Sequence, residues 1–226
     1  MQTNELIFTP ANSLQEQFIW NVDRESIFDG GIGNGKTTGG LIRLLLLASS
    51  YPKSRWVIFR ETYLDLRKTT YKTFIDKVCP PSWVDRNVKE ETRLKNGAEI
   101  IWMHLDETSE QTLSGLEING AFGDQIEEID PEKWELLDGR IGRWQMPEWE
   151  APCPAYIWGT SNPKGKDWVY YRFHPQASEH RIKLGDDRER LYLFGETSVN
   201  KELLQRINPG YYENLLRKPE SWKKIW

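Results

Sequence analysis

The segment from Gly30 to Thr37 restricts the possible folds of this chain more than any other feature of its sequence. It reads GGIGNGKT and stands between an apolar run, Ser26 to Asp29, and a leucine-rich stretch, Lys36 to Ser49. We expect the first to be a strand and the second to be a buried helix. In that context the pattern G-x-x-x-x-G-K-T forms a phosphate-binding loop. The pattern therefore predicts an α/β fold of the P-loop NTPase class (RecA-like, ASCE), with a mainly parallel central sheet flanked by helices.

The residue types in this loop suit the binding of ATP together with magnesium. Glycine permits the backbone angles and the close approach that let main-chain N–H groups surround a phosphate. Lys36 brings an ammonium group to the β- and γ-phosphates, and the Thr37 hydroxyl can bind Mg²⁺. The alternative is a glycine-rich turn that only caps a helix, but the spacing and the flanking runs together favour a nucleotide site. The ATP-binding residues predicted from the loop are Gly30, Gly31, Gly33, Asn34, Gly35, Lys36, Thr37 and Thr38.

Other apolar runs predict the rest of the sheet and its helices. Arg55 to Arg60 contains a continuous apolar run, which is typical of an interior parallel strand. Asn96-Gly97 resembles a hairpin turn, so we expect a small antiparallel excursion around it. The other expected strands span Thr92–Leu94, Glu99–Met103, Ile118–Gly123, Ala155–Thr160 and Leu191–Gly195, and the other expected helices span Leu14–Asn21, Thr62–Val78, Pro131–Gly139 and Asn208–Lys218.

Length and composition limit the class of protein. The 226 residues suit one large α/β domain, so we expect a single P-loop domain over residues 1–226. The 34 acidic and 30 basic residues give a net charge of −4, which argues against binding nucleic acid through bulk positive charge. Cys79 and Cys153 have no metal-binding spacing, and the longest apolar stretch, Leu41 to Ala48, is far shorter than the roughly 20 residues of a membrane span. We therefore expect a cytosolic protein without a membrane partner or a secretion signal.

An acidic segment follows the expected strand that ends at Gly123. Asp124 stands at the strand end, where a P-loop enzyme needs a carboxylate to hold Mg²⁺ through water. The next residue would usually be a glutamate that accepts a proton from the attacking water, but here it is Gln125, which can only orient water. The base is Glu127, Glu128 or absent, and the sequence leaves this open. For either glutamate, the alternative role is membership of a solvated acidic cluster at a helix start.

Short polar side chains follow the expected strand from Ala155 to Gly159. Thr160, Ser161 and Asn162 emerge at its carboxyl end, which is the sheet edge that carries the phosphate loop. Such side chains can sense the γ-phosphate and couple its loss to motion elsewhere. The alternative is an ordinary turn that leads into Pro163.

These motifs together resemble the ATPase domain of the large terminase subunits of tailed bacteriophages, the motors that pump DNA into an empty capsid. The resemblance covers about residues 6–225. Phe8-Thr9-Pro10 followed by Gln15-Glu16-Gln17-Phe18 looks like the adenine-contacting segment of the family, which implies that Gln15 binds ATP. The segment 160–163 followed by the aromatic stretch 168–173 is similar to its coupling motif, and residues 60–69 and 115–129 resemble its arginine-containing and metal-binding segments.

The resemblance implies a function, a location and a set of partners. ATP hydrolysis with Mg²⁺ would drive double-stranded DNA into a viral procapsid, in a homo-oligomeric ring that can be monomeric when isolated. A portal protein would serve as dock and a small terminase subunit as recruiter, in the cytoplasm of the infected host cell. Family members usually continue into a nuclease domain with clustered aspartates. We expect that domain to be absent from this chain, and we therefore expect no DNA cleavage.

This sequence departs from the family pattern in its basic residues. Family members commonly carry an arginine inside the phosphate loop, where Ile32 stands, and a basic residue before the glycine equivalent to Gly115. An arginine finger must then come from elsewhere, and Arg60, Arg140 and Arg143 are the candidates. Each of them taken singly is better explained as a surface or ion-pair arginine.

Three other functions use the same phosphate loop. A nucleic-acid-dependent ATPase of the helicase type would normally need a second RecA-like domain, so this chain would be a truncated helicase. A small-molecule kinase should show an arginine-rich lid, for which Arg140 and Arg143 are a thin basis. A weakly hydrolysing or non-hydrolysing nucleotide-binding module is suggested by Gln125. ATP turnover with and without DNA and procapsids discriminates among these functions.

Overall fold

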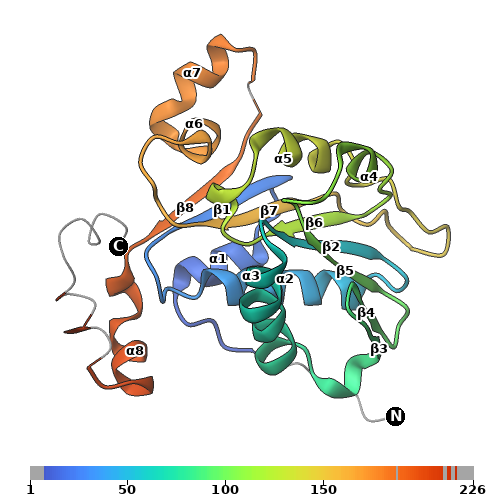
Figure 1. Ribbon diagram of the computed structural model, residues 1–226, viewed down its shortest axis with the longest axis horizontal. Coiled ribbons are helices and arrows are strands. Elements are labelled where there is room, and N and C mark those ends of the chain that lie inside the picture. Colours follow the sequence, from blue (N-terminus) through green and yellow to red (C-terminus); the bar gives the residue numbers. More distant parts are fainter. Residues whose placement is uncertain (1–7, 187, 211–212, 215–216, 218–226) are drawn as a thin grey trace.

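An eight-stranded sheet forms the centre of the protein, as shown by a computed structural model that describes residues 8–186, 188–210, 213–214 and 217 (Figure 1). The strand order is β3-β4-β5-β2-β6-β7-β1-β8. The six strands from β5 to β8 in this order pair in parallel, whereas β3 and β4 form an antiparallel hairpin at the edge. The strands are β1 (Glu25–Gly30), β2 (Arg55–Arg60), β3 (Val84–Asn87), β4 (Glu91–Leu94), β5 (Glu99–His104), β6 (Gly120–Gly123), β7 (Ile157–Ser161) and β8 (Leu191–Gly195).

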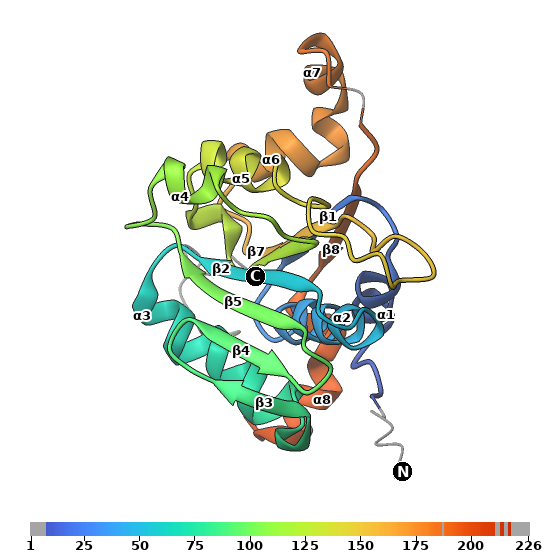
Figure 2. The same ribbon diagram turned by 90° about the vertical axis from the view of Figure 1, so that its right-hand side faces the viewer.

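Helices cover both faces of the sheet (Figures 1 and 2). One face carries α1 (Ser13–Trp20), α2 (Lys36–Ser50) and the helical segment that begins with α3 (Tyr63–Asp65), and the other carries α4 (Glu110–Ser114), α5 (Pro131–Asp138) and α6 (Trp168–Phe173). The chain also forms α7 (Ser178–Lys183), α8 (Lys201–Ile207) and short 3-10 turns at Pro81–Trp83, Ile126–Glu128, Pro175–Ala177 and Thr197–Asn200. Among the described helices, none combines the length and the apolarity needed to cross a membrane.

Each face of the sheet has its own apolar core. Neighbouring side chains of a strand point to opposite faces, so in β1 Phe28 packs with the α1 and α2 side and Ile27 with the α4 and α5 side. Both side chains are fully buried. Burial on both faces explains why the interior strands read as continuous apolar runs rather than as alternating patterns.

The structure confirms most of the predicted elements and corrects several. The hairpin around Asn96-Gly97 exists as β4 and β5, and the mainly parallel sheet is confirmed. Ile118 makes only an isolated bridge with Ile141, so the predicted strand starts later, at Gly120. The α4, α6, α7 and α8 helices were not predicted, because each is too short for a clear helical period. The predicted helix Asn208–Lys218 includes positions 211–212, 215–216 and 218, which lie outside the described residues.

The predicted helix Thr62–Val78 exists, but most of it is not α-helical. After α3, the chain forms two π-helical segments, Leu66–Tyr71 and Phe74–Val78. A π-helix is wider than an α-helix and is frequently found at functional sites. The hydrophobic pattern of the sequence does not distinguish between the two, so the prediction of a regular helix was wrong in this respect.

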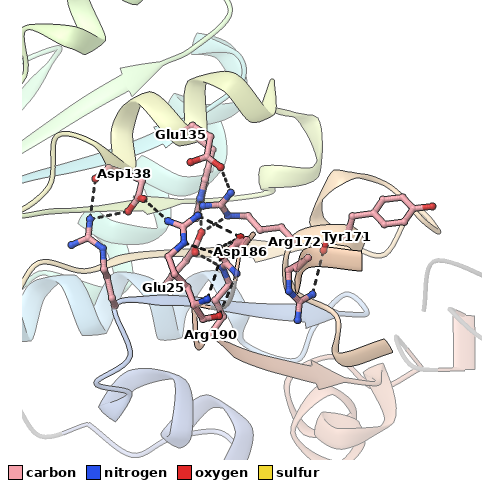
Figure 3. Close-up of polar contacts among 11 residues, drawn as sticks. Glu25, Glu135, Asp138, Tyr171, Arg172, Asp186 and Arg190 are labelled. Atoms are coloured by element: carbon pink, nitrogen blue, oxygen red, sulfur yellow. Dashed lines mark hydrogen bonds and ion pairs between the residues drawn. The ribbon is translucent and has the colours of Figure 1, made fainter. Parts of the chain in front are cut away.

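An ion-pair network fastens α6 and α7 to the edge of the sheet opposite the phosphate loop (Figure 3). The Glu25 carboxylate, at the start of β1, accepts hydrogen bonds from Arg172 and Arg190. Burial alone would raise the pKa of Glu25, but the two guanidinium groups outweigh it and hold the pKa below its usual value. Arg190 also binds Asp186 at 2.7 Å, and Arg172 also binds Glu135. The network ties the helices that follow β7 to the strand that leads into the phosphate loop.

Candidate nucleotide-binding site

The phosphate loop connects β1 to α2 at the carboxyl edge of the sheet, as the sequence predicted. Gly33 and Gly35 have φ angles of +87° and +81°, which side chains rarely tolerate. A cleft of about 250 Å³ lies against the loop. The cleft is lined by Ile32, Gly33, Asn34, Gly35, Lys36, Thr37 and Thr38 of the loop and helix, and by Asp124, Gln125, Thr160 and Asn162 of other strand ends.

Gly30 shows why the loop needs glycine at its first position. A side-chain Cβ atom there would lie 2.0 Å from the main-chain oxygen of Gly195, at the end of β8. That oxygen also accepts hydrogen bonds from the main-chain N of Gly31, at 3.0 Å, and from the Asn34 side chain, at 2.6 Å. The end of β8 therefore fixes the position of the phosphate loop.

Three side chains from outside the loop hold its main-chain carbonyls. The sequence predicted Gln15 as an ATP contact, and its buried amide group donates to the loop. Asn12 and Asn200 were not predicted, because neither belongs to a motif that the sequence shows. The donated hydrogen bonds run from Asn12 to Asn34 (3.1 Å), from Gln15 to Gly35 (2.8 Å) and from Asn200 to Gly33 (2.9 Å).

The Lys36 ammonium group is buried beneath the loop. It donates hydrogen bonds to the carbonyl oxygens of Gly30 and Gly31, at 2.8 and 2.7 Å, and to the Asn162 side chain, at 3.2 Å. Burial lowers its pKa to about 8, although the nearby carboxylates of Asp29, Asp124 and Glu127 oppose this change. A phosphate group would supply the negative charge that this ammonium group needs.

Asp124 lies where the sequence predicted it, at the end of β6. Three hydroxyl groups donate to its carboxylate: Thr37 and Thr160 at 2.7 Å, and Thr70 at 2.6 Å. Thr37 is the predicted metal-binding hydroxyl, so the loop and the strand-end carboxylate are in direct contact. Thr70 comes from the π-helical segment and is fully buried. No motif in the sequence indicates Thr70, because its position depends on the irregular helix.

The acidic segment after Asp124 forms a tight turn. Gln125 has a left-handed backbone, with φ 57° and ψ 56°, and the 3-10 turn Ile126–Glu128 follows it. The Glu127 carboxylate accepts a hydrogen bond from the Asn162 side chain at 3.2 Å, and its second oxygen is buried without a hydrogen-bond partner. Burial raises the pKa of Glu127 to about 7. Glu128 lies further out, one third exposed, and pairs with Arg60 at 3.4 Å.

The three arginine candidates lie in different places. Arg60, at the end of β2, is buried beside the acidic turn, where it also donates to the Thr69 hydroxyl at 2.6 Å. The main-chain N of Arg143 donates to Ile118, just before β6 begins, and Arg140 lies in the same turn. Because β6 ends at the phosphate-loop edge, Arg140 and Arg143 lie at the opposite edge of the sheet. The structure thus brings only Arg60 to the candidate site.

The coupling residues divide between two clefts. Thr160 and Asn162 line the nucleotide cleft, whereas Ser161 lines a neighbouring cleft of about 300 Å³ together with Asp29. The Tyr192 hydroxyl donates to Asp29 at 2.9 Å, and burial raises the pKa of this carboxyl. Of the coupling side chains, Asn162 makes the direct contacts with both Lys36 and Glu127.

The fold and this edge of the sheet define a P-loop NTPase. A family model for the large subunit of terminase, T4likevirus-type, N-terminal, matches residues 27–191, and the chain belongs to this family. The resemblance seen in the sequence is thereby confirmed. No curated protein sequence matches the chain.

Solved structures of phage terminases have the same fold. The large terminase of a thermophilic bacteriophage superposes with a TM-score of 0.67 at 15% identity, covering 95% of this chain and 52% of that protein. The same terminase in complex with ADP superposes with a TM-score of 0.64 at 14% identity, covering 94% of this chain and 51% of that protein. The large terminase ATPase domain of Thermus phage P74-26 superposes with a TM-score of 0.63 at 15% identity, covering 94% of this chain and 91% of that domain. The chain thus spans about half the length of the first of these large terminases.

Proposed function

We propose that this chain hydrolyses ATP to drive double-stranded DNA into a viral procapsid. The single observation that carries the proposal is the position of Asn162. Its side chain touches the phosphate-loop ammonium group of Lys36 and the buried carboxylate of Glu127. A group at this position would respond to the presence of a γ-phosphate and to the state of the attacking water. Membership of the terminase family supports DNA packaging as the process that this response serves.

Thr37 and Asp124 suit a magnesium ion, because hydroxyl and carboxylate oxygens are its preferred ligands. Among the described residues, no cluster of three His, Cys, Asp or Glu side chains could enclose a metal ion. The ion would therefore depend on phosphate oxygens and water for its other ligands, as is usual for magnesium. When bound, Mg²⁺ neutralises charge on the β- and γ-phosphates.

Glu127 is our candidate for the residue that activates water. Its free oxygen is buried and unpaired, and its raised pKa of about 7 makes it a better proton acceptor than an ordinary carboxylate. Asn162 holds the other oxygen in place. Glu128 is the weaker candidate, because Arg60 occupies its carboxylate. Gln125 cannot accept the proton, and its strained backbone serves to turn the chain so that Glu127 reaches the site.

The remaining ATP contacts follow from the second cleft beside the loop. A cleft of about 710 Å³ is lined by Thr9 to Ala11 and by Ser198 to Leu203, so it adjoins Asn200 and the predicted adenine segment. We place the base and ribose there, with the phosphates on the loop. Gln15 then acts chiefly by holding the loop, since its amide group is already bonded to Gly35 and Ala11.

The wider assembly is also part of the proposal. Residues 1–226 act as one ATPase domain within a homo-oligomeric ring, docked on a portal protein and supplied with DNA by a small terminase subunit, in the cytoplasm of the infected host cell. An arginine finger from Arg140 or Arg143 would have to act on a neighbouring subunit, because both lie at the far edge of their own sheet. Arg60 would act within its own subunit, by holding the acidic turn.

The test is magnesium-dependent ATP turnover, measured with and without double-stranded DNA and empty procapsids. Lys36→Ala should abolish turnover, and Glu127→Gln should reduce it at least roughly 100-fold, whereas Glu128→Gln should retain most of it. Stimulation by DNA and procapsids supports the motor. Stimulation by single-stranded nucleic acid alone would favour a helicase-type ATPase, and unchanged turnover in Lys36→Ala would reject the site.

A further inference from the structure

The nucleotide site contains several carboxylates but few cations that could reach a γ-phosphate. Ile32 lines the nucleotide cleft from the phosphate loop but carries no charge. Arg60 is buried, and its guanidinium group is bonded to Thr69 and Glu128. Arg140 and Arg143 lie at the opposite edge of the sheet. None of these four residues in the same subunit would therefore add to Lys36 and magnesium in facing the charge that develops on the phosphate during hydrolysis.

Lys164 lies in the loop that joins β7 to α6, two residues after Asn162. Its ammonium group is 3.9 Å from a carboxylate oxygen of Glu128, and its side chain is 51% exposed. Its charge also reaches Glu127, where it partly offsets the rise in pKa that burial causes. Lys164 is therefore a cation that already interacts with both acidic residues of the turn beside the nucleotide cleft.

The contact between Lys164 and Glu128 is weak enough to be exchanged. Exposed ion pairs at such distances contribute little to stability, because water screens the charges and the long side chain loses freedom. A phosphate oxygen carries more charge and offers a stronger, charge-assisted hydrogen bond. Gly165 has no atom within 4 Å of the position of a Cβ, so the loop beside Lys164 has space around it.

We propose that Lys164 is a catalytic residue that leaves Glu128 and binds the γ-phosphate as it is transferred to water. It supplies the positive charge that an arginine finger supplies in other P-loop enzymes. This inference rests on the proposed function, since it concerns the same ATP hydrolysis. It also explains how a loop without a basic residue at Ile32 can complete the reaction within one subunit.

Three variants test this proposal. Lys164→Ala should lower kcat about 100-fold or more, because an electrostatic contact made only in the transition state is lost. The affinity for ATP should stay within about twofold, and Lys164→Arg should restore much of the rate. The matched control is Lys166→Ala, in the same exposed loop. The Lys166 ammonium group lies over the Tyr170 ring, 5.6 Å from its centre, so its removal should leave kcat unchanged.

Binding of ADP with aluminium fluoride, which imitates the phosphate in transfer, separates this proposal from the proposed function. Lys164→Ala should bind this complex at least tenfold more weakly than the wild type, while its affinity for ADP alone is unchanged. If the wild type does not hydrolyse ATP, the proposed function fails, but this binding measurement still tests Lys164. Equal analogue binding by Lys164→Ala would overturn the proposal. So would normal basal turnover with a loss only of DNA stimulation, which would make Lys164 a DNA contact.

Discussion

Replacing Glu127 by glutamine should stabilise the fold at pH 8 while it stops ATP hydrolysis. The wild-type carboxyl has its pKa raised from 4.5 to about 7, with burial as the main cause. Between these two values the folded protein binds the proton more tightly than the unfolded chain. Stability of the wild type is therefore lost as the pH rises from below 5 to above 7, where the buried carboxylate is ionised.

The size of the effect follows from the pKa change. Each tenfold change in proton affinity corresponds to about 1.4 kcal/mol, so the rise from 4.5 to about 7 corresponds to about 3 kcal/mol at pH 8. Glutamine has nearly the same shape and cannot ionise, so Glu127→Gln avoids this cost. At pH 5 the wild-type side chain is mostly protonated in the folded state, and the gain should shrink to about 1 kcal/mol.

Urea unfolding at pH 5 and pH 8, with matched salt, measures both values. Glu128→Gln is the control, because it removes ion pairs to Arg60 and Lys164 and should lower stability or leave it unchanged. Glu127→Gln should gain more unfolding free energy at pH 8 than at pH 5. An equal gain at both pH values, or a loss at pH 8, would refute the claim that burial raises the pKa of Glu127.

Three further predictions concern the same site. Thr70→Val should lose about 1.5–3 kcal/mol of unfolding free energy and weaken the dependence of ATP turnover on Mg²⁺, because Asp124 loses a buried donor. Thr70→Ser should restore both properties. Denaturant unfolding measures the first, and magnesium titration of turnover measures the second. The value of kcat/KM for ATP should fall below about pH 7, where Glu127 takes up a proton, and above about pH 8, where Lys36 loses one. A value of kcat/KM that does not change with pH would contradict these roles. Gly30→Ala should abolish nucleotide binding in calorimetry, because the added Cβ would lie 2.0 Å from a β8 carbonyl oxygen.

The parallel core of the fold could be predicted from the sequence, because its signals are local. The runs at Ser26–Asp29 and Arg55–Arg60 are largely apolar, and each lies in an interior strand buried on both faces. The phosphate loop also has a local signal, since its motif occupies eight consecutive residues. The β4-β5 hairpin followed from one turn dipeptide, Asn96-Gly97. By contrast, β3 has three exposed residues and little apolar pattern, so no period in the sequence revealed it.

The parts of the site that could not be predicted come from distant segments or irregular backbone. Thr70 reaches Asp124 only because the helix around it is π-helical, and the hydrophobic pattern does not separate π- from α-helix. Glu127 meets Asn162 after a turn in which Gln125 adopts a left-handed backbone, which is uncommon for residues other than glycine. Asn200 meets the phosphate loop through chain topology alone.

The dependence of the phosphate loop on β8 affects the order in which the protein becomes competent during synthesis. The Asn34 side chain and the Gly195 oxygen that it binds are separated by 161 residues. At about 5–20 residues per second, a ribosome makes the loop roughly ten to thirty seconds before this support at the end of β8. Capture of nucleotide is therefore a late event that reports a completed sheet, and a growing chain cannot use ATP to help its first strands assemble.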